Sequence, residues 1–148
     1  ADHEIEIAAD KSIPEIFKDH GEAYFREGER RVISRLIENG AQVLSTGGGA
    51  FINEETRQAV QARGISVWLK ADLPLLMKRV MKRADRPLLQ TGDPEAVMRK
   101  LMDQRYPIYA TADVTVESRD VQHTQMVNEV IKVLAKWPGW ERLNNANS

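Results

Sequence analysis

Three consecutive glycines, Gly47, Gly48 and Gly49, follow a short apolar segment and precede Ala50. Glycines let backbone N–H groups come close to a ligand, and they also supply positive φ at a sharp turn. A plain turn between a strand and a helix needs one glycine and seldom three. We therefore expect this loop to contact a ligand, with a tight structural turn as the alternative.

Two arginines lie on predicted helices beside apolar stripes. Arg26 stands one position off its stripe with Glu22 and Glu29 within helical reach, so spacing alone favours a surface ladder of ion pairs. Arg105 continues the stripe of its own helix, four residues after Leu101. Its guanidinium either extends outward at the helix end, where the dipole favours a cation, or points into a cleft. Spacing leaves both interpretations of Arg105 open.

A third arginine, Arg86, lies between Asp85 and Pro87 in a polar loop over about residues 83–93. Loops of this length inside a compact α/β domain are often lids. A lid that carries an arginine over a phosphate is a common device in phosphoryl transfer, and an ordinary surface loop is the alternative.

Asp2 and Glu6 bracket the beginning of the chain, which we predict to be the end of a strand. An aspartate in that place can bind a hydroxyl group or act as a base, and it can equally be a solvated surface residue. The three histidines, His3, His20 and His123, lack the spacing of metal ligands, so we predict no zinc site.

The composition describes one folded domain and excludes several classes of protein. The 148 residues are 42% hydrophobic and 29% charged, and a chain of this length forms about one domain. Because 21 Lys and Arg stand against 22 Asp and Glu, the net charge is −1 and no global basic field attracts nucleic acid. No segment approaches the roughly 18 apolar residues of a membrane span, and the lack of cysteine excludes disulfides.

Helices and strands alternate along the chain and must position these residues. A capping box of Ser12 and Glu15 predicts a helix that ends at Gly21, and a second helix follows over 22–38. Four further helices are predicted: one over 53–63, one that begins at Asp72, one from Pro94 to Pro107, and a last one that ends at Trp137. Strands are predicted over 42–46, 65–70 and 113–117, and a loose tail over about 138–148.

This alternation implies βαβ units and a parallel sheet covered on both faces, which makes the chain an α/β domain. In such domains ligands bind at the carboxyl ends of the strands. We therefore expect the functional site at the loops after residues 46, 70 and 117, together with the strand end at Asp2.

Taken together, these residues resemble shikimate kinase. Six blocks agree in order and in spacing from residue 2 to about 135, and six weak motifs in register make a specific match. The blocks are Asp2-x-x-Ile5-Glu6; Ser12-Ile13-Pro14-Glu15-Ile16-Phe17; Gly21-Glu22-x-x-Phe25-Arg26-x-x-Glu29; Ser45-Thr46-Gly47-Gly48-Gly49-Ala50; Arg86-Pro87-Leu88-Leu89; and Arg105-x-Pro107-x-Tyr109 with Ala112-Asp113.

The resemblance implies a three-layer α/β fold with a parallel sheet, of the P-loop nucleoside and small-metabolite kinase type, in a single domain over residues 1–148. It implies transfer of the γ-phosphoryl group of ATP, with Mg²⁺, to a hydroxyl of shikimate. The product would be shikimate 3-phosphate, in aromatic amino-acid biosynthesis. A monomeric, cytoplasmic enzyme that binds neither nucleic acid nor membrane is expected.

The resemblance also implies roles for individual residues. Arg26 and Arg105 match the guanidinium groups that bind the shikimate carboxylate, and the backbone of Gly47–Gly49, Gly48 included, matches further substrate contacts. Asp2 matches the substrate-binding aspartate that orients or deprotonates the attacking hydroxyl, and Arg86 matches the lid arginine over the phosphates. On the adenine side Arg79 matches an arginine of the family, and Arg119 or Gln122 would complete that pocket.

One motif of the family, the P-loop GxxxxGK[ST], does not occur in the 148 residues. That motif supplies the backbone cradle, the lysine and the Mg²⁺-binding hydroxyl for the phosphates. We therefore expect the chain to be the C-terminal part of a longer polypeptide, with the P-loop strand and helix before Ala1 and no metal ligand among these residues. The alternatives are a P-loop-less fragment or non-catalytic shikimate-binding relative, and a kinase of another small metabolite such as gluconate.

Overall fold

The computed structural model describes residues 1–82 and 92–146. These residues form two compact units, Ala1–Gly64 together with the residues from Glu141 onward, and Ile65–Trp140. No helix among the described residues has the length and apolar character that crossing a membrane requires.

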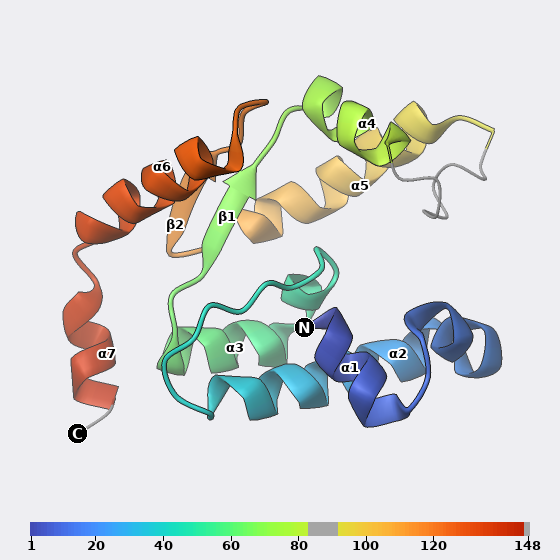
Figure 1. Cartoon of the computed structure of the whole chain (residues 1–148), viewed down its shortest axis with the longest axis horizontal. Coiled ribbons are helices and arrows are strands. Elements are labelled where there is room, and N and C mark those ends of the chain that lie inside the picture. The colour runs from blue at the N-terminus through green and yellow to red at the C-terminus, as the bar shows by residue number, and fades with distance from the viewer. Residues whose placement is uncertain (83–91, 147–148) are drawn as a thin grey trace. The chain divides into compact units, whose positions relative to one another are not determined.

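The first unit is helical (Figure 1). Its core joins Ile5, Ile16, Phe25 and Val32, which come from the first two helices. The elements are α1 (Asp2–Ala9), α2 (Ile13–Ile37), the short 3₁₀ helix η1 (Ala50–Ile52), α3 (Glu54–Arg63) and α7 (Trp140–Ala146), whose first residue belongs to the second unit.

The beginning of the chain is helix α1, so the prediction of a strand end at residues 2–6 is wrong. The alternation Ile5-Glu6-Ile7 is typical of a strand, which would place both isoleucines on one face. In the helix they face different sides: Ile5 is buried in the core and Ile7 is exposed. Packing against α2 therefore decides the local structure here.

Helix α2 confirms the predicted pair of helices on either side of Gly21. Ser12 accepts a hydrogen bond from the Glu15 amide, and the Glu15 carboxylate accepts one from the Ser12 amide, which completes the capping box. Gly21 breaks the helical path with φ 83° and ψ 177°, a left-handed conformation that glycine adopts without strain.

The segment 42–46 does not form the strand that its apolar residues predict. Val43 is fully exposed, and the carbonyl of Ser45 accepts a hydrogen bond from the N-terminal amine of Ala1 at 2.8 Å. A strand forms only where a neighbouring strand supplies hydrogen-bond partners. In the described residues the sheet has two strands, and neither belongs to this unit.

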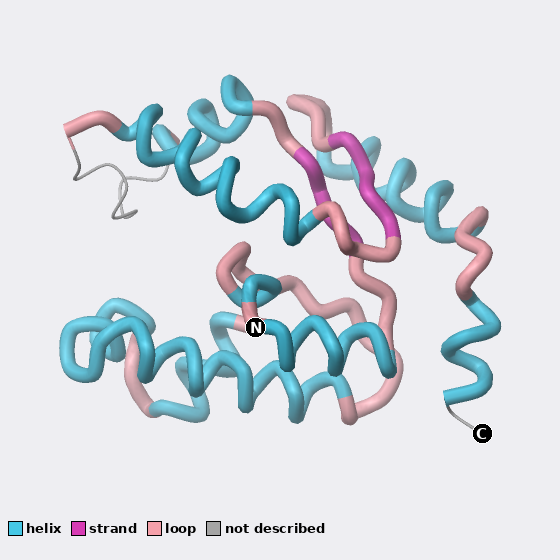
Figure 2. Tube along the Cα trace, turned by 180° about the vertical axis from the view of Figure 1, so that it is seen from behind, coloured by secondary structure: helices cyan, strands magenta, loops and turns pink. Residues whose placement is uncertain are grey.

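The second unit is an α/β arrangement with a parallel pair of strands (Figure 2). Val67 pairs with Val114, and Asp113 and Ser66 bond to each other at the beginning of both strands. The elements are β1 (Val67–Lys70), α4 (Leu73–Met81), α5 (Pro94–Tyr109), β2 (Val114–Glu117) and α6 (His123–Ala135). The predicted α/β class with a parallel sheet is confirmed.

The structure differs from the prediction at the end of α5 and at the C-terminal segment. Helix α5 continues past Pro107 to Tyr109, because the proline ring removes only one amide and the Ala110 amide still donates to the Tyr106 carbonyl at 2.9 Å. The C-terminal residues expected to be a loose tail form helix α7 instead. Arg142 in that helix donates to the carbonyl of Gly64 at 2.8 Å.

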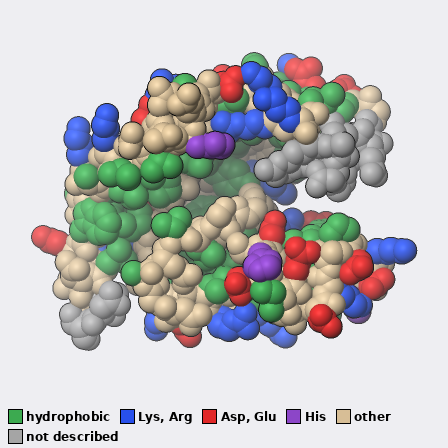
Figure 3. All heavy atoms as spheres, in the orientation of Figure 1, with side chains coloured by type: hydrophobic (Ala, Val, Ile, Leu, Met, Phe, Trp, Pro, Cys, Tyr) green, Lys and Arg blue, Asp and Glu red, His purple; other side chains and the backbone are tan. Residues whose placement is uncertain are grey.

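Helix α6 leaves much of its apolar side uncovered. Val127 and Ile131, one turn apart, are 54% and 57% exposed. Figure 3 shows hydrophobic side chains gathered over the part of the surface where Figure 1 places α6. The helix is amphipathic by sequence, yet none of its side chains is buried in the described structure.

Candidate active site

The residues matched by the sequence to substrate and nucleotide fall into two groups, one in each unit. Asp2, Arg26 and the loop Gly47–Gly49 belong to the first unit. The second unit holds the remaining residues that the structure describes, namely Arg79, Arg105, Arg119 and Gln122. Arg86 and most of the predicted lid at 83–93 lie outside the described residues.

Arg26 lies directly against the triglycine loop. A Cβ atom added at Gly49 would overlap the Arg26 guanidinium, so only glycine lets the two groups approach in this way. Gly49 has φ −70°, which any residue adopts, so the close approach and not the backbone conformation requires glycine here. The structure thus brings together two features that the sequence analysis singled out separately.

A buried carboxylate fixes the Arg26 side chain. Glu29 is 4% exposed, and its Oε1 accepts a hydrogen bond from Arg26 Nη1 at 2.9 Å. A second, exposed partner, Glu22, lies 3.6 Å from Arg26 Nε, and the guanidinium also stands 5.2 Å from the centre of the Phe25 ring. Both ion pairs expected from the spacing are present, but the shorter one joins Arg26 to a buried carboxylate and is not a surface pair.

The hydrogen bonds of the glycine loop leave donors available. The carbonyls of Gly47 and Gly49 accept from the amides of Ala50 and Ile52, at 3.2 and 3.3 Å. In the described residues, neither the Gly47 nor the Gly49 amide has an acceptor. Unpaired amides beside a guanidinium make a local positive potential that suits a small anion such as a carboxylate.

Asp2 is exposed at the beginning of α1. In the described part of the chain its carboxylate takes part in no hydrogen bond or ion pair. The bond from the Ala1 amine to the Ser45 carbonyl ties this helix end to the segment that leads into Gly47. The first unit therefore holds three separate features: a carboxylate without a described partner, a fixed guanidinium and unpaired amides.

Arg105 lies in the second unit on α5 and is partly buried. Its side chain has no hydrogen bond or ion pair to another described residue. The next residue, Tyr106, donates its hydroxyl to the Ala71 carbonyl, packs edge-to-face on Trp68, and has its pKa raised by burial. These contacts hold the end of α5 against the carboxyl end of β1. The sequence analysis missed Tyr106, although it directly follows Arg105.

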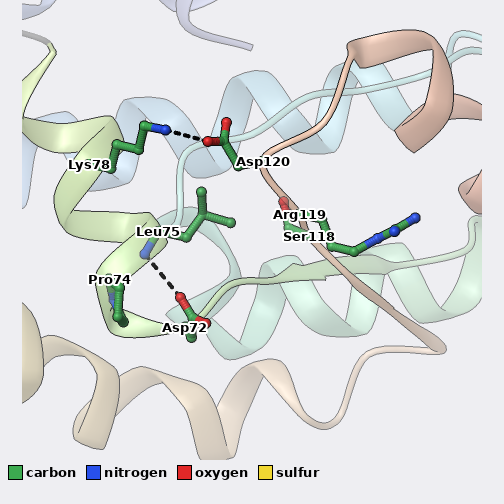
Figure 4. A pocket seen from close by; sticks show the side chains of 7 residues that line it. All are labelled: Asp72, Pro74, Leu75, Lys78, Ser118, Arg119 and Asp120. Carbon is green, nitrogen blue, oxygen red and sulfur yellow. Dashed lines mark hydrogen bonds and ion pairs between the residues drawn. The ribbon is translucent and has the colours of Figure 1, made fainter.

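A hollow of about 380 Å³ lies at the carboxyl ends of both strands of the second unit (Figure 4). Across it Lys78 and Asp120 form an ion pair, and the hydrogen bond from Lys78 lowers the pKa of the Asp120 carboxylate. Figure 4 shows these two side chains pointing toward each other, while that of Arg119 extends away from them. The lining residues are Asp72, Pro74, Leu75, Lys78, Ser118, Arg119 and Asp120.

Of the three residues matched to the adenine side, Arg119 lines this hollow, and Arg79 bonds to two of the lining residues. Arg79 donates to Ser118 Oγ at 2.9 Å and to the Arg119 carbonyl at 3.4 Å, and the Arg119 guanidinium pairs with Glu129. Gln122 is the residue before α6 and is not among those that line the hollow. The sequence analysis did not predict that Lys78 and Asp120 line this hollow.

Comparison with known proteins identifies the family. The family model for shikimate kinase matches residues 1–135. This chain belongs to the shikimate kinase family. It is 56% identical over 134 residues to a shikimate kinase of Bradyrhizobium diazoefficiens, and 53% identical over 134 residues to one of Rhodopseudomonas palustris. These matches cover 90% of this chain and 65% and 66% of the two relatives, so it spans just under two thirds of their length.

Solved structures of the family confirm the fold. The shikimate kinase from Acinetobacter baumannii in complex with shikimate matches with a TM-score of 0.84 and 35% identity, over 90% of this chain and 75% of that one. The shikimate kinase from Aquifex aeolicus matches with a TM-score of 0.79 and 33% identity, over 90% and 78%. The resemblance drawn from the six blocks and the predicted kinase fold are therefore confirmed.

Proposed function

We propose that this chain takes part in the transfer of the γ-phosphoryl group of ATP to a hydroxyl of shikimate, which gives shikimate 3-phosphate. The observation that carries the proposal is the corner formed by Arg26, Glu29 and Gly49. A guanidinium held by a buried carboxylate, against a glycine loop with unpaired amides, suits the carboxylate of a small polyol acid.

The residues proposed for the substrate side are those matched by the resemblance. Arg26 and the amides of Gly47–Gly49 would bind the shikimate carboxylate, and Arg105, which has no partner in the described chain, would supply a further guanidinium. Asp2 would accept a hydrogen bond from the attacking hydroxyl and orient or deprotonate it. Its exposed, unpaired carboxylate has the freedom that this role requires.

The nucleotide side rests on Arg79, Arg119, Gln122 and the lid residue Arg86. The hollow at the carboxyl ends of the strands would hold the nucleotide base beside Arg119, which Arg79 contacts, since ligands of parallel sheets bind there. Arg86 would stabilise the charge that develops on the transferred phosphoryl group. Mg²⁺ would accompany ATP; the described residues hold no group of three or more His, Asp or Glu side chains that could bind a metal ion, and we assign it no ligand here.

The wider setting is part of the same proposal. Both units would belong to one kinase domain with a lid at about 83–93, in a monomer that acts in the cytoplasm on small molecules and not on nucleic acid or membranes. The reaction would serve aromatic amino-acid biosynthesis. The net charge of −1 supports action on small molecules rather than on nucleic acid.

The decisive experiment measures ADP release from Mg·ATP by the protein as it occurs naturally, with shikimate, with gluconate and with neither. We expect release that depends on shikimate alone. Release with gluconate alone would assign the chain to another small-metabolite kinase. Calorimetric binding of shikimate without any ADP release would show a shikimate-binding relative that does not catalyse the reaction, and would overturn the proposed activity.

A further inference from the structure

Arg57 holds the end of the segment that follows the glycine loop. Its Nη1 donates two hydrogen bonds, to the Phe51 carbonyl at 2.9 Å and to the Ile52 carbonyl at 2.7 Å. Both bonds are partly buried. The arginine belongs to α3, so its side chain reaches back over the N-terminus of its own helix to η1.

With these two bonds, every carbonyl from Gly49 to Ile52 has a donor. The carbonyls of Gly49 and Ala50 accept from the amides of Ile52 and Asn53, each at 3.3 Å, and the next two accept from Arg57. Carbonyls at the end of a short helix otherwise lack an intramolecular donor. Because Ala50 is 2% exposed, η1 is also anchored by packing, directly beside Gly49.

Neither a counter-ion nor the helix dipole explains why the Arg57 guanidinium lies beside η1. In the described residues no carboxylate pairs with Arg57, whereas Arg30 on α2 pairs with both Glu27 and Glu55. Arg57 also lies near the N-terminus of α3, where the helix dipole favours anions. The two carbonyls of η1 are the partners that account for its position.

We propose that Arg57 is a positioning residue of the substrate site. By fixing η1 it would hold the preceding glycine loop in the form in which Gly49 lies against the Arg26 guanidinium. The proposal rests on the proposed function, because it assumes that this corner binds the shikimate carboxylate. Small displacements of groups that position a substrate weaken binding and catalysis strongly, so loss of the two bonds should be felt at the site.

The test compares Arg57→Met with Arg63→Met in the protein as it occurs naturally. Arg63 is exposed in the last turn of the same helix, so the control removes the same charge without touching η1. We expect Arg57→Met to weaken shikimate binding, measured by calorimetry without nucleotide, by about tenfold, because two hydrogen bonds from a charged donor are lost. The KM for ATP should change by less than about twofold, and Arg63→Met should bind shikimate normally.

Two further measurements separate positioning from general instability or simple charge. Arg57→Lys keeps the charge, so an electrostatic role predicts normal binding, while a positioning role predicts binding intermediate between the wild type and Arg57→Met. The weakening should also persist in high salt, which would screen a purely electrostatic effect. With the neutral carboxamide of shikimate, the difference between the wild type and Arg57→Met should largely disappear, since the anion contacts are already lost.

The failures are distinguishable. If the wild-type protein does not bind shikimate, the proposed function falls and this inference falls with it. If it binds shikimate and Arg57→Met matches Arg63→Met, the inference alone is wrong. Should Arg57→Met fail to fold, Arg57→Lys decides the matter, because wild-type affinity in that variant contradicts a positioning role.

Discussion

The two arginines matched to the substrate carboxylate stand in opposite surroundings. In the first unit Arg26 is fixed by the buried Glu29, packs on Phe25 and lies against Gly49. In the second unit Arg105 is partly buried and has no hydrogen bond or ion pair to another described residue. One guanidinium is therefore preorganised by its own unit, and the other has hydrogen-bonding capacity that no described residue uses.

Because of this difference, we expect the two arginines to contribute differently to the stability of the fold and to substrate binding. Breaking the Arg26 contacts leaves a buried carboxylate without its partner, so folding and binding should both suffer. Removing Arg105 leaves no described group without a partner, so binding should suffer alone. Charged side chains without a partner are then the best candidates for direct chemistry, and Asp2 is the other prominent one in the site.

The largest effect is expected at Asp2. Asp2→Asn keeps the size of the side chain but cannot accept a proton, so kcat should fall by about 100- to 10,000-fold, the usual range for a general base. The KM for ATP should change little, and so should the melting temperature, because this carboxylate has no described partner. Steady-state kinetics measure both constants, and an unchanged kcat would remove Asp2 from the reaction.

Alanine at the two arginines tests the comparison directly. Arg26→Ala and Arg105→Ala should each raise the Kd for shikimate by about tenfold to a hundredfold, since each removes a charged donor from the carboxylate. Arg26→Ala should also lower the free energy of unfolding by about 1–3 kcal/mol, because Glu29 stays buried without its partner. Arg105→Ala should leave it within about 0.5 kcal/mol.

Calorimetry and denaturant unfolding of the two variants provide both readouts. Equal losses of stability in the two variants would contradict the contrast between a fixed and an unpaired arginine. Normal shikimate affinity in either variant would remove that residue from carboxylate binding. The double variant Glu29→Gln with Arg26→Ala should recover part of the lost stability, because a neutral amide is less costly to bury than a charge.

Gly49→Ala should displace the Arg26 guanidinium without unfolding the chain. The added methyl group overlaps the far end of a flexible side chain, and φ −70° suits alanine. We expect shikimate binding to weaken by about tenfold, because a displaced guanidinium loses its bonds to the carboxylate. Gly28→Ala on α2 is the matched control, since its Cβ would meet nothing and alanine favours a helix. Equal affinity of the two variants would contradict the role of the contact.

Local signals in the sequence predicted the helices well. The capping box at Ser12, the caps at Asn53 and Asp72, and the break at Gly21 depend on residues a few positions apart, and the structure confirms each of them. These features are readable because a cap satisfies amides of its own helix. Short apolar or alternating segments predicted the two strands, and the structure pairs them with each other as β1 and β2.

Features that depend on distant residues could not be predicted in this way. The segment 42–46 has the composition of a strand but no neighbouring strand among the described residues of its unit, and α1 has a strand-like alternation that packing against α2 overrides. The contact between Arg26 and Gly49 joins separate elements, so spacing alone favoured an ordinary ion-pair ladder. The resemblance to the family is what connected the two residues before the structure did.

The smallest effect concerns an ion-pair cluster on α2 that, unlike Glu29, is exposed. Hydrogen bonds from Arg30 and Arg31 lower the pKa of Glu27 to about 2. A carboxylate whose pKa is lower in the folded state stabilises the fold above its unfolded pKa, and this contribution fades as the pH falls toward the folded value. The stabilisation from Glu27 should therefore be complete at neutral pH and decline between about pH 4.5 and 2.

Comparing Glu27→Gln with the wild type by urea unfolding at several pH values measures this contribution. The difference in unfolding free energy between the two should shrink as the pH falls below about 4.5, and added salt should reduce it at neutral pH because the cluster is exposed. Shikimate affinity at neutral pH should be unaffected. If the difference in unfolding free energy instead grows as the pH falls, Glu27 does not stabilise the folded state through these arginines. The stabilising ion pair on α2 would then be the one between Arg26 and the buried Glu29.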